Sequence, residues 1–453
     1  MSTGLERRRN KSLVTNYFAV LLILVVMSFP APGGAVPAGS SETFAFADGV
    51  ELQTVLAEAL ANNMDLQSAG DTARAFEAEI PLAGSLEDPR LGVGVANLPT
   101  DTFDFDQEPM TQKQIALAQK LPWFGTLDLS KERADLRAQE QQWLVVDARQ
   151  KLVRQLKEAW YDLGFTEYSL TINGELDTIV DQMIQVAETR YATGEGLQQD
   201  ILQGQVRLSE LLERRIQLES NRLRLRNRIG ALLNRESPFT EQISERLPES
   251  TVLPAPETLY TAALAASPEL AVRRTGLLRA EKEVELARKK YAPDMDFRVS
   301  YGQREDDPVT GRDRADFFSA GVTINVPVWK KNRQDSVYQA SLERLESAKN
   351  GVLAYERALP RRIDGLMAEY EGARQNQHLL GEAISVQNEQ LADSSLAAYS
   401  VGKIEFATML NARVAVLQSR LATRKYSYEM YKKLAELEEL IGKPIEEIEL
   451  ETQ

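Results

Sequence analysis

Few side chains in this sequence could carry out catalysis or hold a metal ion. Its 453 residues contain one histidine, His378, and no cysteine. Without cysteine there is no thiolate zinc ligand, iron–sulfur cluster or disulfide, and one imidazole supplies little for histidine-based catalysis. Gly442-Lys443 also lacks the glycine spacing of a phosphate-binding loop. We therefore predict no enzyme activity, no cofactor and no metal site.

The charge balance also narrows the possible partners. The chain has 53 basic and 67 acidic side chains, giving a formal net charge of −14. A general nucleic-acid binder needs a basic surface that neutralises phosphates, so no nucleic-acid partner is expected. The hydrophobic fraction of 43% predicts a folded core and not a disordered chain.

The first residues predict export from the cytoplasm. Arg7-Arg8-Arg9 precedes an apolar run from Tyr17 to Phe29, and small residues follow as far as Ala35. A basic segment, a short apolar segment and a small-residue exit are the parts of a secretory signal peptide. The apolar run is shorter than the roughly 20 residues of a spanning helix, although a retained inner-membrane anchor is the alternative. We expect residues 1–35 to be a cleaved signal peptide.

Landmarks in the first half of the chain recur in the second half. Leu60–Leu66 resembles Leu264–Leu270, Leu121-Pro122-Trp123 resembles Val326-Pro327-Val328, and Tyr191-Ala192-Thr193-Gly194 resembles Tyr399-Ser400-Val401-Gly402. The order is the same and the offset is nearly constant, which indicates a duplicated unit. We predict a first repeat over 36–245 and a second over 246–453.

Each repeat should contain long helices. Few breakers occur in four stretches, and Gly164, Gly174, Pro360 and Gly365 are expected to bend or interrupt the long helices. Leucines at sevenfold spacing predict coiled-coil packing between neighbouring helices. On the helices alone, a soluble bundle is an equal alternative. The predicted helices are an amphipathic helix at about 50–80 and again at about 257–290, and long helices at about 127–190, 197–233, 331–398 and 404–441.

Short alternating segments precede each pair of long helices. In Phe318–Val326, one face is wholly apolar and the other is small or polar. Such a period of two is typical of the strands of an outer-membrane β-barrel. The loops between the paired segments are acidic, as expected of loops in water. The predicted strands are about 90–98, 113–121, 295–304 and 316–328.

Four strands cannot close a barrel in lipid. Known membrane barrels begin at about eight strands, and an open edge in lipid leaves backbone groups unpaired. We therefore expect several subunits to pool their strands. A soluble antiparallel sheet covered by helices is the alternative.

The duplicated order of helix, strand pair, long helix, Tyr-x-x-Gly turn and returning helix resembles the TolC-type outer-membrane efflux proteins. The resemblance covers about 48–445, and its most specific parts are Arg190–Gly194 leading to Ile201-Leu202 and Tyr399–Gly402 leading to Met409-Leu410. It implies an α+β membrane protein that forms a homotrimer. Its shared 12-stranded β-barrel, four strands from each chain, would continue into a long periplasmic α-helical barrel.

Gln119–Thr126 resembles the strand-to-helix elbow of the metal-exporting branch of that family, in which a Gln-x-x-Pro-Trp-x-Gly-Lys pattern is frequent. Thr126 departs from the usual lysine, and the elbow is needed whatever the substrate, so the elbow alone does not assign the chain to the metal branch. Pro122 ends the strand, because proline lacks a ladder donor, and Gly125 permits a sharp reversal. The elbow residues are Pro122, Trp123 and Gly125, with Pro327 and Trp329 in the second repeat.

In the family, the two Tyr-x-x-Gly turns meet the tips of a periplasmic adaptor. The matching positions here are Arg190, Tyr191, Gly194, Leu197, Tyr399, Gly402 and Ile404. The family's acidic gate positions, six and nine residues after the second glycine, are Thr408 and Asn411. Asp200 and Glu405 could supply a charged ring at the gate instead. Alternatively, these acids simply face solvent.

The resemblance implies a passive outer-membrane channel that extends into the periplasm. Its partners would be the outer-membrane lipid, a periplasmic adaptor (membrane fusion) protein and an inner-membrane pump, with a resistance-nodulation-division (RND) pump favoured. Its substrates would be metal ions, drugs or other small molecules. The alternatives are the channel of an ABC-type protein or peptide secretion system and an exported coiled-coil scaffold without a pore.

Overall fold

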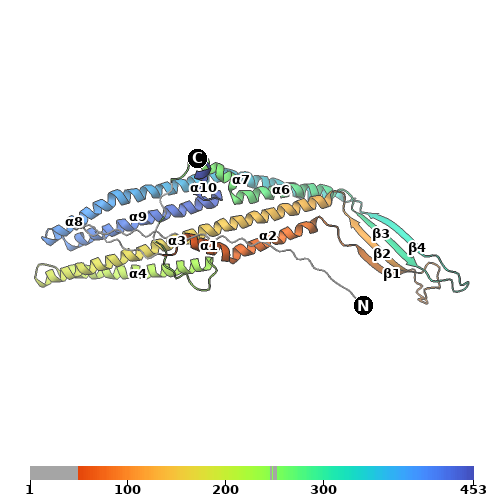
Figure 1. The fold of residues 1–453 in the computed structure, drawn as a ribbon, viewed down its shortest axis with the longest axis horizontal. Coiled ribbons are helices and arrows are strands. Elements are labelled where there is room, and N and C mark those ends of the chain that lie inside the picture. The colour runs from red at the N-terminus through yellow and green to blue at the C-terminus, as the bar shows by residue number, and fades with distance from the viewer. Residues whose placement is uncertain (1–48, 245–246, 248–251, 453) are drawn as a thin grey trace, which may run out of the picture. The chain divides into compact units, whose positions relative to one another are not determined.

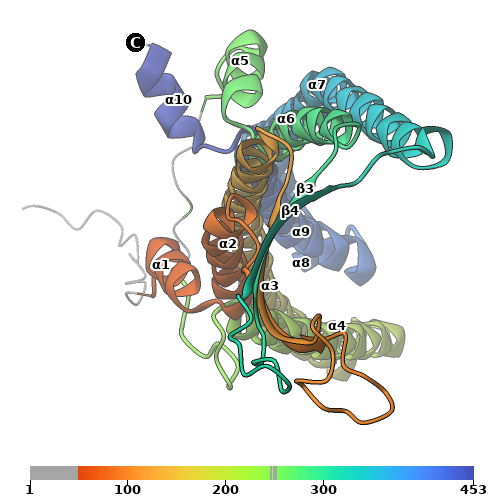
Figure 2. The ribbon, with the colours of Figure 1, turned by 90° about the vertical axis from the view of Figure 1, so that its right-hand side faces the viewer.

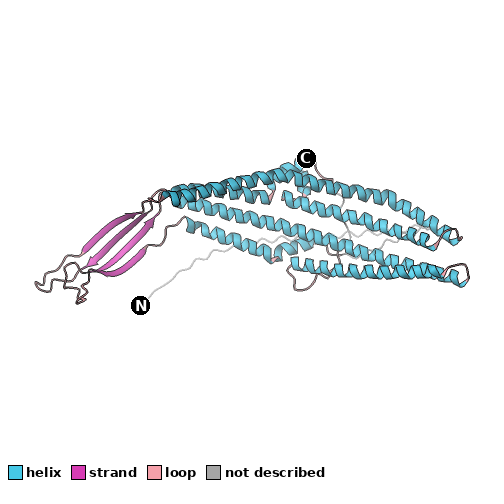
Figure 3. Ribbon diagram, turned by 180° about the vertical axis from the view of Figure 1, so that it is seen from behind, coloured by secondary structure: helices cyan, strands magenta, loops and turns pink. Residues whose placement is uncertain are grey.

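The structure is a computed structural model that describes residues 49–244, 247 and 252–452. The expected signal peptide, residues 1–35, lies outside these ranges. The described residues belong to a single compact unit. Within it, helices lead into a small sheet at one end and into two helical turns at the other (Figures 1 and 3).

Each amphipathic segment folds as two helices and not as the single helix predicted. Asn63 separates the first two and caps the second, because its side-chain oxygen accepts a 3.0 Å hydrogen bond from the Leu66 amide. Pro268 begins the second helix of the later pair. Proline suits the first helical position, because the amide that it lacks would have no partner within the helix there. The helices are α1 Leu52–Asn62, α2 Met64–Ala83, α5 Pro256–Ala266 and α6 Pro268–Lys289.

The long helices agree closely with the predicted ranges, except in the second repeat. There the expected single stretch is divided by a π-helical segment, Leu379–Ile384. No helix among the described residues is long and apolar enough to cross a bilayer. The helices are α3 Thr126–Ala192, α4 Gln198–Leu232, α7 Gln334–His378, α8 Ser385–Ser400, α9 Phe406–Ile441 and α10 Ile445–Thr452, and a 3₁₀ turn at Lys330–Asn332 precedes α7.

The four predicted breakers do not interrupt any helix. α3 runs through Gly164 and Gly174, and α7 runs through Pro360 and Gly365. Gly164 serves packing instead, because a Cβ on it would lie 2.8 Å from the Tyr428 hydroxyl. The prediction was bending or interruption at the four residues, and no interruption is found; at Gly164, the close contact with Tyr428 explains the glycine.

The residues at sevenfold spacing form two seams and are buried or partly buried along the long helices; they are Leu211, Leu218, Leu225 and Leu232 in α4, and Val414, Leu421 and Tyr428 in α9. Leu211 and Leu225 in α4 are 5% and 0% exposed, and Val414 and Tyr428 in α9 are 5% and 4% exposed. Leu211 and Val414 belong to one apolar cluster that joins α3, α4 and α9. The seams thus hold the two helical hairpins together.

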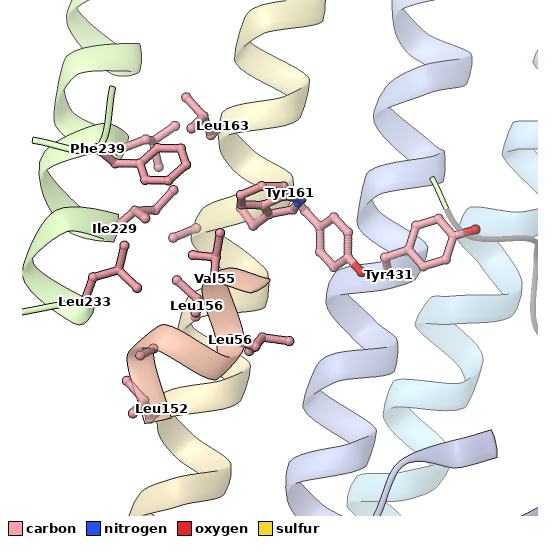
Figure 4. Packing of buried hydrophobic residues seen from close by; sticks show 14 of the residues in the cluster. Val55, Leu56, Leu152, Leu156, Tyr161, Leu163, Ile229, Leu233, Phe239 and Tyr431 are labelled. Carbon is pink, nitrogen blue, oxygen red and sulfur yellow. The ribbon is translucent and has the colours of Figure 1, made fainter. Parts of the chain in front are cut away.

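A second apolar cluster packs α1 against the middle of α3 and the end of α4. Figure 4 shows Val55 and Leu56 of α1 beside Leu156 of α3, and Ile229 and Phe239 nearby. The cluster reaches α9 through Tyr161 and Tyr431, whose ring centroids are 5.5 Å apart. It is the main core of the described chain and connects α1, α4 and α9 to α3.

The four strands form one antiparallel sheet in the order β1-β2-β3-β4. β4 ends at Ile324 and not at the predicted residue 328; one further bond follows, from the Asn325 amide to the Asp294 oxygen, and Pro327 has no backbone amide that could carry the ladder on. Figure 2 shows that the sheet is curved. The strands are β1 Arg90–Ala96, β2 Gln112–Leu121, β3 Met295–Gln303 and β4 Phe317–Ile324.

The register places the apolar residues on one face of the sheet. Val93 pairs with Ile115, Ile115 with Tyr301, and Tyr301 with Phe318. Directly paired residues point to the same face, so these four side chains form one row across the sheet. Val93 is 80% exposed and Phe318 73% exposed. The other face carries small and polar residues, as the alternation predicted.

Candidate functional site

Two helical turns of the same geometry lie at the end of the helices away from the sheet (Figure 1). One joins α3 to α4 and the other joins α8 to α9. In each turn, the backbone amide of a glycine donates a hydrogen bond to the backbone oxygen of the tyrosine three residues earlier. The bond from Gly194 to Tyr191 is 3.1 Å long, and the bond from Gly402 to Tyr399 is 2.9 Å long. Both glycines have positive φ, +77° and +71°, a conformation that other residues adopt only with strain.

Arg190 connects the two turns. Its Nη1 donates a 2.9 Å hydrogen bond to the backbone oxygen of Tyr399. Its guanidinium also lies 4.7 Å from the centroid of the Tyr399 ring, within the range of a cation–π contact. The backbone oxygen of Arg190 accepts hydrogen bonds from the amides of Glu195 and Gly196. The backbone of Arg190 is therefore fixed within the first turn, while its side chain is bonded to the second turn.

The two equivalent tyrosines have different environments. Tyr191 is 50% exposed, whereas Tyr399 is 5% exposed and packs edge-on against Phe406 at 5.9 Å. Burial raises the pKa of the Tyr399 hydroxyl, partly offset by the positive charge of Arg190. The negative charge of Asp200 raises the pKa of this hydroxyl further. Tyr399 is therefore a packing residue, and Tyr191 is a surface residue.

The remaining predicted tip residues differ in their exposure. Leu197 is 65% exposed and begins α4, whereas Ile404 is partly buried against the cluster that contains Tyr399. Val401, 66% exposed, adds an apolar side chain that we did not single out from the sequence. Its position inside the Tyr-Ser-Val-Gly landmark is the signal that could have identified it.

Three of the four predicted gate residues lie at the start of α9, and the fourth, Asp200, lies at the start of α4. Thr408 and Asn411 are exposed and three residues apart on α9, so they share a face of that helix. Glu405 is exposed at the start of α9 and makes no side-chain cap. Asp200 is half-buried in the first turn of α4.

The first elbow is a tight turn between β2 and α3. Pro122 directly follows the strand, and the Thr126 amide bonds to the Trp123 oxygen at 3.0 Å. Gly125 precedes α3 with a φ of +74°. Lys289, at the end of α6, donates a 3.0 Å bond to the Phe124 oxygen. No sequence signal connected Lys289 with the elbow, because the two are far apart in the chain.

The second elbow is longer. Pro327 is half-buried, and Trp329 is 74% exposed just before the 3₁₀ turn. Phe124 of the first elbow is also 74% exposed. Aromatic residues of this kind are common where a membrane barrel meets water. The two elbows thus bring exposed rings to the same end of the sheet.

A family model described as outer membrane efflux protein matches residues 259–443, which include the second hairpin, the second elbow and Tyr399–Gly402. That description is of an efflux protein and not of an enzyme. No curated protein sequence matches the chain.

Solved outer-membrane channels share the fold over most of the chain. OprN has a TM-score of 0.74 at 17% identity, with 86% of this chain and 89% of that chain covered. The outer membrane protein VceC from Vibrio cholerae has a TM-score of 0.71 at 14% identity, covering 87% and 96%. The MtrE outer membrane channel of Neisseria gonorrhoeae, solved in its open state, has 0.71 at 15%, covering 87% and 89%. The resemblance to the TolC-type outer-membrane efflux proteins is therefore confirmed, by the family model over the second repeat and by the fold over most of the chain.

Proposed function

We propose that this chain is the outer-membrane channel of a tripartite export system and works as a homotrimer. The observation that carries the proposal is the sheet. β1 and β4 are its outer strands, and neither has a second partner among the described residues. An apolar row that includes Val93 and Phe318 is exposed on one face.

Lipid and neighbouring subunits would satisfy both features. The apolar face needs an apolar surrounding, because exposed rows of this kind are unfavourable in water. The free edges need strand partners, because unpaired backbone groups cannot remain in hydrocarbon. Three copies that join β1 of one to β4 of the next would close a 12-stranded barrel. The small and polar face would then line the channel.

We propose that the two turns dock a periplasmic adaptor. Tyr191, Leu197 and Val401 form exposed apolar positions at the end opposite the sheet. Both glycine turns present backbone without a bulky side chain, which favours close approach of another chain. An RND pump in the inner membrane would supply the energy, and the channel itself would conduct metal ions, drugs or other small molecules passively.

The gate of this channel would lie beside the same turns. Three copies of a carboxylate around a narrow axis attract cations. Of the two acids, Glu405 is the stronger gate candidate, since it is exposed at the start of α9, whereas Asp200 is half-buried in the first turn of α4. We therefore propose that Glu405, Thr408 and Asn411 face the lumen at the gate.

Planar-bilayer recording tests the function and the gate together. The purified mature protein should give discrete conductance steps with cation selectivity. Glu405→Gln should reduce this selectivity more than Asp200→Asn, while Glu219→Gln on the exposed side of α4 serves as the control. An absence of any conductance would contradict the channel and support the scaffold alternative. Unchanged selectivity in both variants would remove the charged gate alone.

A further inference from the structure

A cavity of about 750 Å³ lies at the junction of the sheet and the helices. Its wall is formed by the end of β2, the start of α3, the end of α6 and the start of α7. Six cationic side chains line it, against three carboxylates. The cations are Lys120, Arg133, Lys289, Lys290, Arg333 and Arg344, and the carboxylates are Glu87, Glu283 and Asp294. The chain as a whole has a net charge of −14, so the charge of this cavity wall is opposite in sign to that of the chain.

Most of these cations have no ion-pair partner among the described residues. Lys120 pairs with Glu87 at 3.1 Å, and Lys289 donates to the Phe124 oxygen. The other four, Arg133, Lys290, Arg333 and Arg344, have no ion-pair partner in the part of the chain that the structure describes. Glu283 is already paired with Arg279, at 2.8 Å. The cavity therefore keeps a positive charge that an incoming anion could balance.

Two helices also begin at this cavity. Thr126 starts α3 and Gln334 starts α7, and both line the wall. Neither Gly125 nor Arg333 caps its helix through a side chain, and the Thr126 amide is already bonded to the Trp123 oxygen, so the donors that remain are the amides further into each first turn. Helix N-termini favour anions, and here they add to the four cationic side chains.

The register of the sheet shows on which face the cavity opens. Lys120 pairs with Asp296, on the small and polar face. Asp294 and Asn325 continue the β3–β4 ladder by one step, through a 3.3 Å bond from the Asn325 amide to the Asp294 oxygen. That step places both residues on the same face as Lys120, and all three line the cavity. The cavity thus lies on the side opposite the exposed apolar row.

We propose that this cavity is a binding site for solutes that carry phosphate or carboxylate groups. Its position on the lumen rests on the proposed channel, but binding of the anion does not. Three copies in a trimer would form a positive belt below the barrel, which would concentrate anionic cargo between the helical tube and the exit. The gate, at the other end of the helices, has no such cations among its predicted residues.

Equilibrium binding of inorganic pyrophosphate to the detergent-purified mature protein tests the site. The Arg333→Gln/Arg344→Gln variant should weaken binding roughly tenfold or more, because it removes two unpaired charges from the wall. Lys290→Gln should weaken it less. The matched control, Arg357→Gln/Arg361→Gln, removes two exposed arginines of α7 that do not line the cavity and should bind as the unmodified protein does.

Circular dichroism establishes that each variant is folded before it is compared. No pyrophosphate binding by the unmodified protein, or equal loss in the cavity and control variants, would overturn the site. Bilayer recording of the same samples separates this result from the channel itself. Conductance without pyrophosphate binding removes only the anion site, whereas binding without conductance removes only the channel.

Discussion

The guanidinium of Arg190 donates a 2.9 Å hydrogen bond to the backbone oxygen of Tyr399, which lies 209 residues further along the chain. This bond joins the turn of the first repeat to the turn of the second. The contact is charge-assisted and is supplemented by the Tyr399 ring, so it is stronger than an ordinary surface bond. It fixes the spacing of the two hairpins where the proposed channel would open.

Replacing Arg190 should loosen this end of the protein. Arg190→Gln removes the charged donor and the cation–π contact, at a cost of about 1–3 kcal/mol. We expect a larger single-channel conductance, because the two turns can then separate. Tyr399→Phe is the control, since it keeps the backbone oxygen and the ring. Equal conductance in the Arg190→Gln variant and the unmodified protein would show that the contact does not limit opening.

Alanine at the two turn glycines should destabilise the protein. Gly194 and Gly402 have positive φ, so Gly194→Ala and Gly402→Ala should each cost about 1–2 kcal/mol. Gly174→Ala is the matched control, because Gly174 lies inside α3 with open space around its Cβ position and should gain about 0.5–1 kcal/mol. Thermal unfolding followed by circular dichroism measures all three. If all three variants changed the unfolding temperature in the same direction, this account of the turns would be contradicted.

Close packing of α3 against α4 depends on Gly204. A Cβ on this residue would lie 2.4 Å from Cγ1 of Ile184, so Gly204→Ala should cost about 1–3 kcal/mol by overpacking. Ile184→Ala removes the obstructing atoms, and the double variant should recover part of the loss relative to the sum of the two single variants. Additive losses in the unfolding midpoint would show that the two residues do not meet.

Alkaline pH should weaken the core that joins the repeats. Burial raises the pKa of Tyr431 from its usual 10.0 to about 12, and burial also raises the pKa of Tyr161 beside it. The folded protein therefore holds these protons more tightly than the unfolded chain. The resulting stability is complete below pH 10 and is lost as the pH rises from 10 to 12.

Thermal unfolding at pH 8 to 12 measures this loss. Tyr431→Phe should reduce the fall in melting temperature between pH 10 and 12, because phenylalanine has no proton to lose. Tyr191→Phe, at an exposed position of the first turn, should leave the fall unchanged. The interpretation fails if both variants follow the unmodified protein over the whole range.

Local patterns in the sequence accounted for most of the secondary structure. Alternation predicted the four strands because one face of the sheet is apolar throughout, and the register confirms that face at Val93, Ile115 and Tyr301. The breaks at Asn63 and Ser267-Pro268 were visible as cap and proline signals, although we predicted one helix in each place. The π-helical segment at Leu379–Ile384 has no comparable signal in its residues.

Contacts between distant residues were beyond the reach of these patterns. The sequence placed Arg190 and Tyr399 in their turns, but nothing in it indicated that the two side chains meet. The bond from Lys289 to the Phe124 oxygen and the positive cavity around it could not be predicted for the same reason. Both form where four separate segments of the chain converge. Such sites depend on tertiary packing, and periodicity does not encode them.

The pooling of strands by three subunits is the central claim, and single-particle electron microscopy of the mature protein in mild detergent tests it most directly. The account predicts hollow particles with threefold symmetry and a detergent belt around the end that carries β1–β4. Monomers, or solid rods without a belt, would contradict it, because the edges of β1 and β4 and the exposed apolar row would then be left in water.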